Sequence, residues 1–151
     1  MKLGFLWNYI TDKIKRDFPN VPTITTTALA EWLNEETRND PLLLDVRAKT
    51  EFDVSHLCNA IHAPDADAVI RQLELHSNQG RQPHAVLYCS VGYRSAKLVK
   101  HLTDQGINDV FNLEGSIFQW FNEDRPVFLD ATVVAEVHPY SRFWKRLLRK
   151  K

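Results

Sequence analysis

The stretch that decides the fold is residues 85–106, AVLYCSVGYRSAKLVKHLTDQG. Its first five residues form an apolar run of the kind that fills a buried parallel strand, and this run ends in Cys89. After the short segment SVGYR, apolar residues recur at helical spacing as far as Gly106, and glycine commonly ends a helix. The pattern therefore predicts a strand, a tight loop and a helix, with a thiol at the tip of the strand.

Short apolar runs and helical patterns alternate along the rest of the chain. Strands are expected at 42–46 (LLLDV), near 60–63 and at 109–113 (DVFNL), with a short β-prone stretch at 23–26. Helices are expected near 27–37, 49–54, 66–76 and within 114–123. This alternation predicts an α/β fold with a doubly wound, mainly parallel sheet flanked by helices. Functional groups in such sheets gather at the carboxyl ends of the strands, where Cys89 lies.

The two ends of the chain add helical segments outside the expected domain of residues 23–130. Residues 1–22 have apolar side chains at helical spacing and predict an amphipathic helix that ends before Pro19 and Pro22. Such a helix packs on the domain or lies on a membrane surface. Residues 131–151 form a basic C-terminal extension. Six of the 19 basic residues lie in its last fourteen positions, which hold no Asp or Glu.

The basic extension has two interpretations. Phe143, Trp144, Leu147 and Leu148 would share one helical face, which predicts a helix docked on the domain with its charges outward. Alternatively, the basic side chains recruit an acidic protein partner or RNA, since the body before them carries 13 basic and 19 acidic residues.

Length and composition exclude several classes of protein. The 151 residues suit one domain, and a composition of 44% hydrophobic and 25% charged residues is typical of a globular chain. No apolar run approaches the roughly 20 residues of a transmembrane segment, and charges interrupt the N-terminus too early for a signal peptide. We expect a cytoplasmic protein, and we expect no DNA partner.

The loop after Cys89 is suited to holding an anion. Gly92 provides the positive φ that a tight loop requires, so that successive backbone N–H groups can point inward. A helix that begins near Ser95 adds partial positive charge, and Arg94 adds a forked donor for an oxyanion. We therefore expect Cys89 to be a reactive thiolate rather than a buried structural cysteine.

Several separated motifs resemble the rhodanese-like domain family, which includes the single-domain thiosulfate sulfurtransferases. The resemblance covers roughly residues 23–127 and rests on LLLDVR followed by EF, on YCSVGYRSA and on NLEGSIFQW. Two stretches depart from the family pattern. The family often has Gly-His-Ile-Pro-Gly-Ala where this chain has SHLCNA at 55–60, and Glu-Gly-Gly where it has EGS at 114–116. These changes leave the cysteine loop intact and bear on substrate preference more than on reaction type.

The resemblance implies a sulfurtransferase that uses no cofactor and no metal. The Cys89 thiolate would attack the outer sulfur of a donor such as thiosulfate and form a persulfide. A thiol or cyanide would then remove the sulfur, and the donor and acceptor could each be a small molecule or a protein. Arg94 would hold the anionic donor. The residues expected to bind the substrate and stabilise the persulfide are Ser90, Val91, Gly92, Tyr93, Arg94 and Ser95.

Other candidate residues have more structural interpretations. Asp45 and Arg47 are expected to support the fold, with Arg47 able to pair with Glu51. Cys58 is expected to be a small buried residue, the alternative being a thiol that resolves the persulfide as a disulfide. The six histidines show no metal-ligand spacing, and two cysteines without C-x-x-C spacing make a poor zinc site.

Two alternative functions remain open. Rhodanese-related phosphatases and arsenate reductases have a Cys-x5-Arg loop. In this chain only four residues separate Cys89 from Arg94, and Tyr88 precedes the cysteine where those enzymes usually have a histidine. The shorter loop favours one sulfur atom over a tetrahedral oxyanion. Many rhodanese-like domains have lost the cysteine and act as binding modules. The presence of Cys89 argues against this role but leaves open a persulfide carrier.

Overall fold

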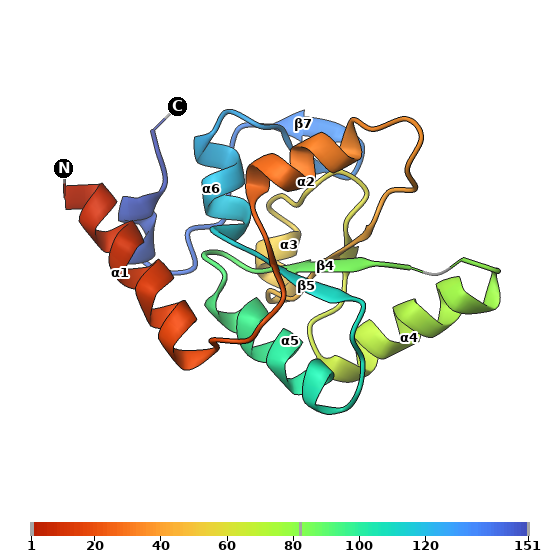
Figure 1. The fold of residues 1–151 in the computed structure, drawn as a ribbon. Helices are drawn as coiled ribbons and strands as arrows, with labels where there is room; N and C mark the ends of the chain where they lie inside the picture. Colours follow the sequence, from red (N-terminus) through yellow and green to blue (C-terminus); the bar gives the residue numbers. More distant parts are fainter. Residues whose placement is uncertain (1, 82, 151) are drawn as a thin grey trace.

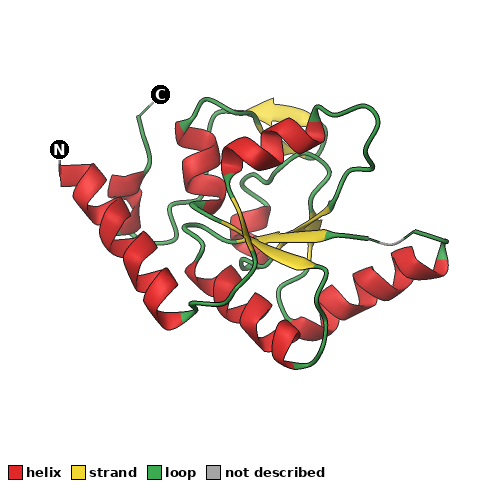
Figure 2. Cartoon of the chain, viewed as in Figure 1, coloured by secondary structure: helices red, strands yellow, loops and turns green. Residues whose placement is uncertain are grey.

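A five-stranded, fully parallel sheet forms the centre of the molecule, with strand order β1-β5-β4-β2-β3 (Figures 1 and 2). The computed structural model describes residues 2–81 and 83–150. The strands of this sheet are β1 (Thr23–Ile24), β2 (Leu42–Asp45), β3 (Ile61–His62), β4 (Ala85–Tyr88) and β5 (Val110–Leu113).

Helices cover both faces of the sheet, as Figure 1 shows. The helices α2 and α6 lie over one face, and α4 and α5 lie over the other. Their bounds, with those of the short α3, are α2 (Thr26–Leu33), α3 (Lys49–Phe52), α4 (Ala66–Asn78), α5 (Tyr93–Asp104) and α6 (Ser116–Asn122). The prediction of a doubly wound parallel sheet is therefore confirmed.

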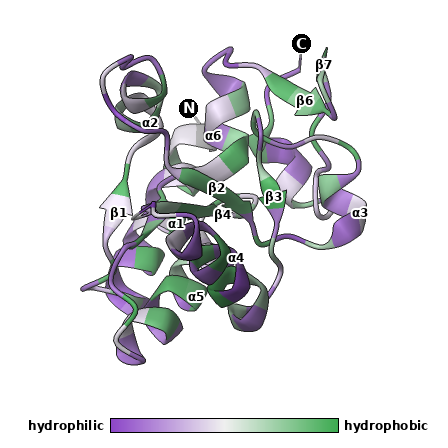
Figure 3. Ribbon diagram, turned by 90° about the vertical axis from the view of Figure 1, so that its right-hand side faces the viewer, coloured by the Kyte–Doolittle hydropathy of each residue, from purple (hydrophilic) through white to green (hydrophobic). Residues whose placement is uncertain are grey.

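Strand β4 shows why the apolar runs are continuous. Alternate residues of a strand point to opposite faces, so Leu87 and Cys89 join the core beneath α4 and α5. Val86 and Tyr88 join the core beneath α2 and α6. Because both faces are covered, every residue of β4 is buried. Figure 3 shows the resulting concentration of apolar residues on β2 and β4.

An antiparallel hairpin follows the parallel sheet. It consists of β6 (Val127–Leu129) and β7 (Thr132–Val134) and is joined to the domain by an isolated bridge between Phe128 and His56. The expected limit of the domain at residue 130 falls in the turn of this hairpin, where Asp130 has a positive φ of 51°.

Two helices differ in extent from the prediction. The helix expected over 27–37 ends at Leu33, where Asn34 caps its last turn. The helix expected to begin near Ser95 begins at Tyr93. The reason is that Gly92, with φ of 102°, takes the N-cap position and turns the chain directly into the first helical turn.

Helix α1 (Lys2–Asp17) lies beside the part of the chain that follows β7, which we call the C-terminal segment, at one end of the molecule (Figure 1). Lys13 pairs with Asp17, and the Tyr93 hydroxyl donates a hydrogen bond of 2.9 Å to the Asp17 carboxylate. This contact joins α1 to α5. The Asn122 side chain bonds the backbone of Leu147 and Arg149, which attaches the C-terminal segment to α6.

The C-terminal segment is only partly as predicted. It forms one 3₁₀ turn, η1 (Trp144–Leu147), instead of an α-helix. Residues three apart align in such a turn, so Trp144 and Leu147 face the core, where Leu148 also packs. Phe143, expected on the docked face, is 51% exposed. The basic side chains at 142, 145, 146, 149 and 150 are exposed, and Lys151 lies outside the described residues.

Candidate active site

Cys89 lies at the carboxyl end of β4, at the start of the loop that leads into α5. Its Sγ accepts a hydrogen bond from the Gly92 N–H at 3.2 Å and lies 3.4 Å from the Ser95 hydroxyl, which can donate to it. The residue is only 1% exposed. The loop therefore presents polar hydrogens to a buried sulfur, an arrangement that stabilises negative charge on that atom.

A side chain at Gly92 would strain the loop. Its φ of 102° lies in the region that L side chains rarely adopt, and a Cβ there would lie 3.3 Å from the Leu113 carbonyl oxygen. The prediction that this glycine shapes the loop is confirmed. The close approach also brings the loop against the end of β5.

The start of α6 forms hydrogen bonds with the backbone of the cysteine loop. The N–H groups of Ile117 and Phe118, which have no partner within their own helix, donate to the carbonyls of Cys89 and Ser90 at 3.2 and 3.0 Å. The Ser116 hydroxyl accepts a bond from the Cys89 N–H at 3.2 Å and donates to the Leu113 carbonyl at 2.9 Å. Ser116 was not predicted as a site residue, although it stands where the family often has a second glycine.

Asn112 is a second residue that the sequence analysis missed. Its side chain donates to the Gly92 carbonyl at 3.2 Å and accepts a short bond of 2.6 Å from the Ser95 hydroxyl. The sequence feature that could have identified Asn112 is its polar side chain within the apolar strand VFNL. In the structure it is only 2% exposed. Asn112 thus orients Ser95, which in turn touches the Cys89 sulfur.

Arg94 forms an ion pair with Glu51 at the edge of the loop. Its two terminal nitrogens each lie 3.0 Å from a Glu51 oxygen, and one also donates to the Ser90 hydroxyl at 2.9 Å. Burial tends to raise the pKa of Glu51, but hydrogen bonds from Arg94 and from the Ala48 N–H outweigh it and hold this pKa below its ordinary value. The fork expected to hold an anionic donor is therefore engaged by a carboxylate, and donor binding by Arg94 stays a prediction.

Asp45 and Arg47 form a second, fully buried ion pair. The Arg47 Nη2 lies 2.6 Å from an Asp45 oxygen and 2.6 Å from the Ser55 carbonyl. The expected pairing of Arg47 with Glu51 is wrong as a hydrogen bond, because the guanidinium turns back onto the strand end two residues away. Both side chains are enclosed, so this pair joins β2 to the segment after α3.

Cys58 differs from its prediction. It is exposed rather than buried, and both cysteines are free thiols. Next to it, Asn59 has a positive φ of 58° at the position of the second glycine in the family's Gly-His-Ile-Pro-Gly-Ala. Asparagine is among the side chains that tolerate this conformation, so the loop turns there without glycine.

A cavity of about 290 Å³ opens in front of Cys89. The cysteine loop supplies one wall through Cys89, Ser90, Val91, Tyr93 and Arg94. We call this the loop wall.

The opposite wall comes from the two ends of the chain, and we call it the terminal wall. Helix α1 contributes Tyr9, Ile10 and Lys13, and the C-terminal segment contributes Tyr140 and Trp144. The Arg94 guanidinium lies 4.4 Å from the centre of the Tyr140 ring, so the two walls touch. The sequence analysis did not place any of these five residues at the site.

No cluster of three or more His, Cys, Asp or Glu side chains in the ranges 2–81 and 83–150 could hold a metal ion. Across the same part of the chain, no helix combines the length and the apolar character needed to cross a bilayer.

A model of the rhodanese-like domain family matches residues 26–123. The chain belongs to this family. The match contains β2, the cysteine loop and α6, and it excludes α1 and the whole C-terminal segment. The family thus accounts for the loop wall of the cavity and leaves the terminal wall outside.

Curated relatives of this rhodanese-like chain are longer proteins. It is 32% identical over 104 residues to a probable adenylyltransferase/sulfurtransferase MoeZ of Mycobacterium tuberculosis, a match that covers 69% of this chain and 26% of the relative. It is 26% identical over 125 residues to the tRNA uridine(34) hydroxylase of Photorhabdus laumondii, covering 77% and 35% respectively. The chain therefore spans about a quarter to a third of the length of these relatives.

Solved structures include rhodanese-like domains of similar size. A rhodanese-related protein from Thermoplasma volcanium is 27% identical, with a TM-score of 0.54 and coverage of 72% of this chain and 99% of that one. The thiosulfate sulfurtransferase of Pseudomonas aeruginosa gives a TM-score of 0.66 over 91% of this chain and 25% of that one. At 20% identity, this second likeness shows the fold alone.

Proposed function

We propose that this rhodanese-like protein is a sulfurtransferase that moves sulfane sulfur from a donor such as thiosulfate to a thiol or cyanide through a persulfide on Cys89. The observation that supports this most is the Cys89 sulfur itself. It faces a cavity, and the Gly92 N–H and the Ser95 hydroxyl lie within hydrogen-bond distance of it.

In the first half-reaction, the Cys89 thiolate attacks the outer sulfur of thiosulfate. A new S–S bond forms, the S–S bond of the donor breaks, and sulfite leaves with the bonding electron pair. The persulfide on Cys89 carries the negative charge on its terminal sulfur. Preorganised donors of the loop and the start of α5 stabilise that charge because they need not reorient during the reaction.

In the second half-reaction, a thiolate or cyanide attacks the terminal sulfur of the persulfide. The acceptor leaves with the sulfur, and the Cys89 thiolate is restored with the electron pair. The two halves share one covalent intermediate, so donor and acceptor kinetics should be ping-pong.

Ser95 is suited to assist the change between thiol and thiolate. Its hydroxyl has one proton and two partners, the Asn112 oxygen at 2.6 Å and the Cys89 sulfur at 3.4 Å. While Cys89 is a thiol, Ser95 can donate to Asn112 and accept from the S–H. When the sulfur becomes anionic, the hydroxyl can turn and donate to it. We propose that Ser95 acts at the sulfur in this way and that Asn112 positions it.

Arg94 distinguishes this proposal from a phosphatase. A phosphate or arsenate would need the guanidinium fork, and that fork is bonded to Glu51 through both terminal nitrogens. We propose that Arg94 fixes the loop wall through its bonds to Glu51 and Ser90. The alternative function is a persulfide carrier or binding module, for which Cys89 would hold sulfur without turnover.

Location and partners complete the proposal. A cytoplasmic location would keep Cys58 and Cys89 reduced, as the chemistry requires. The exposed basic side chains of the C-terminal segment would contact an acidic partner protein, the donor or acceptor of sulfur.

Intact mass spectrometry of the reduced protein after incubation with thiosulfate tests the function. We expect the wild type to gain the mass of one sulfur atom and to lose it when cyanide is added. Cys89→Ser should gain nothing. Cys58→Ser, which removes the exposed cysteine and keeps Cys89, should behave like the wild type. No gain with thiosulfate or with a persulfide donor would reject the sulfurtransferase and favour the binding module.

A further inference from the structure

The terminal wall lies outside the part of the chain that the family model matches. Of the ten described residues that line the cavity, the five of the terminal wall precede residue 26 or follow residue 123. The groups that bond the Cys89 sulfur, the Gly92 N–H and the Ser95 hydroxyl, belong to the cysteine loop and the start of α5 rather than to the terminal wall. The terminal wall therefore has another task, and its composition indicates which.

The terminal wall is aromatic and apolar. Ile10 is buried, Trp144 is half-buried, and the rings of Tyr9 and Tyr140 are 54% and 50% exposed at the mouth of the cavity. Aromatic rings of this kind bind apolar and aromatic groups. The volume of about 290 Å³ is close to the lower limit of about 300 Å³ for pockets that bury small organic ligands. Thiosulfate has no apolar group that would use these rings.

The charges near the cavity are compensated. Among the described residues that line it, the basic ones are Lys13 and Arg94. Lys13 is paired with Asp17 at 2.7 Å, and Arg94 is paired with Glu51 at 3.0 Å. Removing a doubly charged anion from water costs much free energy unless unpaired charges replace the water. The cavity therefore favours a donor with one negative charge over one with two.

From these observations we propose that the sulfane-sulfur donor of this protein carries an apolar organic group of about the size of an aromatic ring and a single negative charge. The organic group lies against Tyr9, Tyr140 and Trp144, and the sulfane sulfur reaches Cys89. This inference rests on the proposed function, since it names the class of substrate for the same cysteine.

The step itself is balanced without any other reactant. For a donor R–SO₂–S⁻, the Cys89 thiolate attacks the outer sulfur, the S–S bond of the donor breaks, and R–SO₂⁻ leaves with the electron pair. An organic persulfide R–S–S⁻ reacts in the same way: the S–S bond of the donor breaks, R–S⁻ leaves with the electron pair, and it takes a proton from water after release. In both cases the organic group stays in the cavity until transfer is complete.

Two thiosulfonates provide matched probes. Benzenethiosulfonate and methanethiosulfonate have the same reacting group and the same charge, and they differ in the organic group. Intact mass monitors persulfide formation, and the measured quantity is the ratio of the two rate constants. Thiosulfate is the doubly charged donor for comparison. We expect the wild type to react faster with both thiosulfonates than with thiosulfate.

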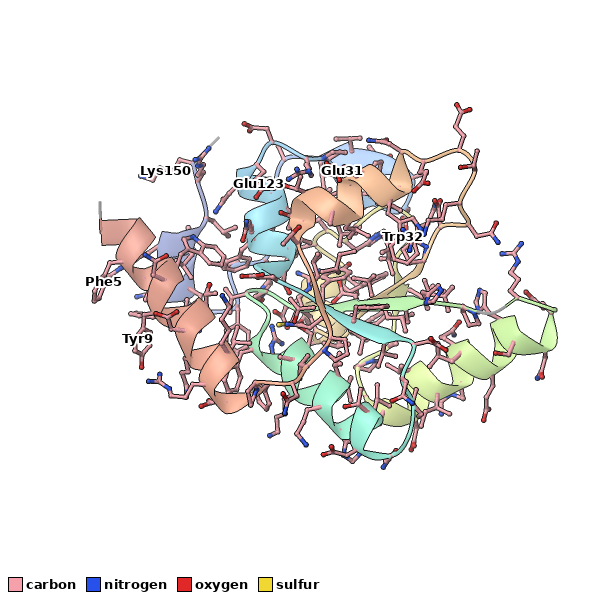
Figure 4. All side chains as sticks on the ribbon, viewed as in Figure 1. Phe5, Tyr9, Glu31, Trp32, Glu123 and Lys150 are labelled. Carbon is pink, nitrogen blue, oxygen red and sulfur yellow. The ribbon has the colours of Figure 1, made fainter. Side chains whose placement is uncertain are left out.

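Variants of the exposed rings locate the organic group. Tyr140→Ala and Tyr9→Ala should each lower the ratio of benzene to methane donor by about threefold to tenfold, the effect of one aromatic contact. Each has a control that does not line the cavity. Val133→Ala, at an exposed apolar residue of β7, is the control for Tyr140→Ala. Phe5→Ala is the control for Tyr9→Ala, since Phe5 and Tyr9 both project from α1 (Figure 4). The controls should leave the ratio unchanged.

The outcomes separate the two proposals. Equal ratios in the wild type, Tyr140→Ala and Tyr9→Ala would overturn the inference about the organic group and leave the sulfurtransferase intact. Faster reaction with thiosulfate than with either thiosulfonate would overturn the inference about charge. No persulfide from any donor would overturn the proposed function and, with it, the inference. Thermal unfolding of each variant shows that a changed ratio does not come from a misfolded protein.

Discussion

The loop wall of the cavity is joined by hydrogen bonds between buried groups, whereas the terminal wall consists of rings that are partly exposed. Behind the loop wall, Ser95 and Asn112 are bonded at 2.6 Å and both are buried. Between the two walls, Lys13 of the terminal wall pairs with Asp17, and Asp17 also accepts a hydrogen bond from Tyr93 of the loop wall; water can replace these exposed contacts. We therefore expect the loop wall to set whether sulfur is held and the terminal wall to set which donor reaches Cys89.

This difference has a physical basis. Buried polar groups lose their hydration whether or not they find partners, so a displaced partner leaves an uncompensated group and a large penalty. Exposed aromatic groups exchange contacts with water at little cost. Changes to the buried hydrogen bonds behind the loop wall should therefore be severe and affect every donor. Changes to the exposed groups should be mild, and selective where these groups line the terminal wall.

The largest effect is expected for Gly92→Ala. A Cβ at φ of 102° is strained and meets the Leu113 carbonyl at 3.3 Å, so the N–H that bonds the Cys89 sulfur must move. Persulfide formation should slow by about 10- to 100-fold for every donor. Gly106→Ala is the matched control, because Gly106 also has a positive φ, of 85°, but its Cβ would meet nothing within 4 Å. If both variants lost activity equally, general backbone strain would explain the loss.

A smaller effect, on stability, is expected for Glu51→Gln. The pKa of Glu51 is held below its ordinary value of 4.5, so the ionised form stabilises the fold. At pH 7 the variant should lose about 1–3 kcal/mol of unfolding free energy, because Arg94 loses its charged partner. This contribution is complete above pH 4.5 and is lost as the pH falls through the lower, folded-state pKa. Urea unfolding at pH 7 and in acid, below the folded-state pKa, measures it.

Glu31→Gln is the control for Glu51→Gln, since Glu31 is an exposed carboxylate on α2 (Figure 4). It should change stability little at either pH. A difference between the wild type and Glu51→Gln that grew in acid would contradict the role assigned to the ion pair.

The smallest effect is expected for Tyr93→Phe. This change keeps the ring in the cavity and removes the hydroxyl that bonds Asp17. The hydroxyl is exposed to water, so thermal unfolding should shift little, and the ratio of donors should change by less than about twofold. A large loss of persulfide formation would contradict this difference, because it would show that the exposed contact between α1 and α5 is as tightly coupled to Cys89 as the buried hydrogen bonds are.

The sequence by itself determined the parallel sheet, the loop after β4 and the position of Cys89 at the strand tip. These features depend on local requirements that leave a pattern in neighbouring residues. A strand covered on both faces must be apolar throughout, and a loop that turns at positive φ needs a residue such as Gly92.

Only the tertiary structure decided the partners of these residues. Arg94 is bonded to Glu51, Ser95 to Asn112, and the cavity is closed by Tyr9 and Tyr140 from opposite ends of the chain. Arg47 bonds Asp45 and Ser55 rather than Glu51, with which the sequence allowed it to pair, and the expected burial of Cys58 and Phe143 was wrong, for the same reason. A hydrogen bond or a contact between distant segments is set by how the elements pack, and local spacing carries no record of that packing.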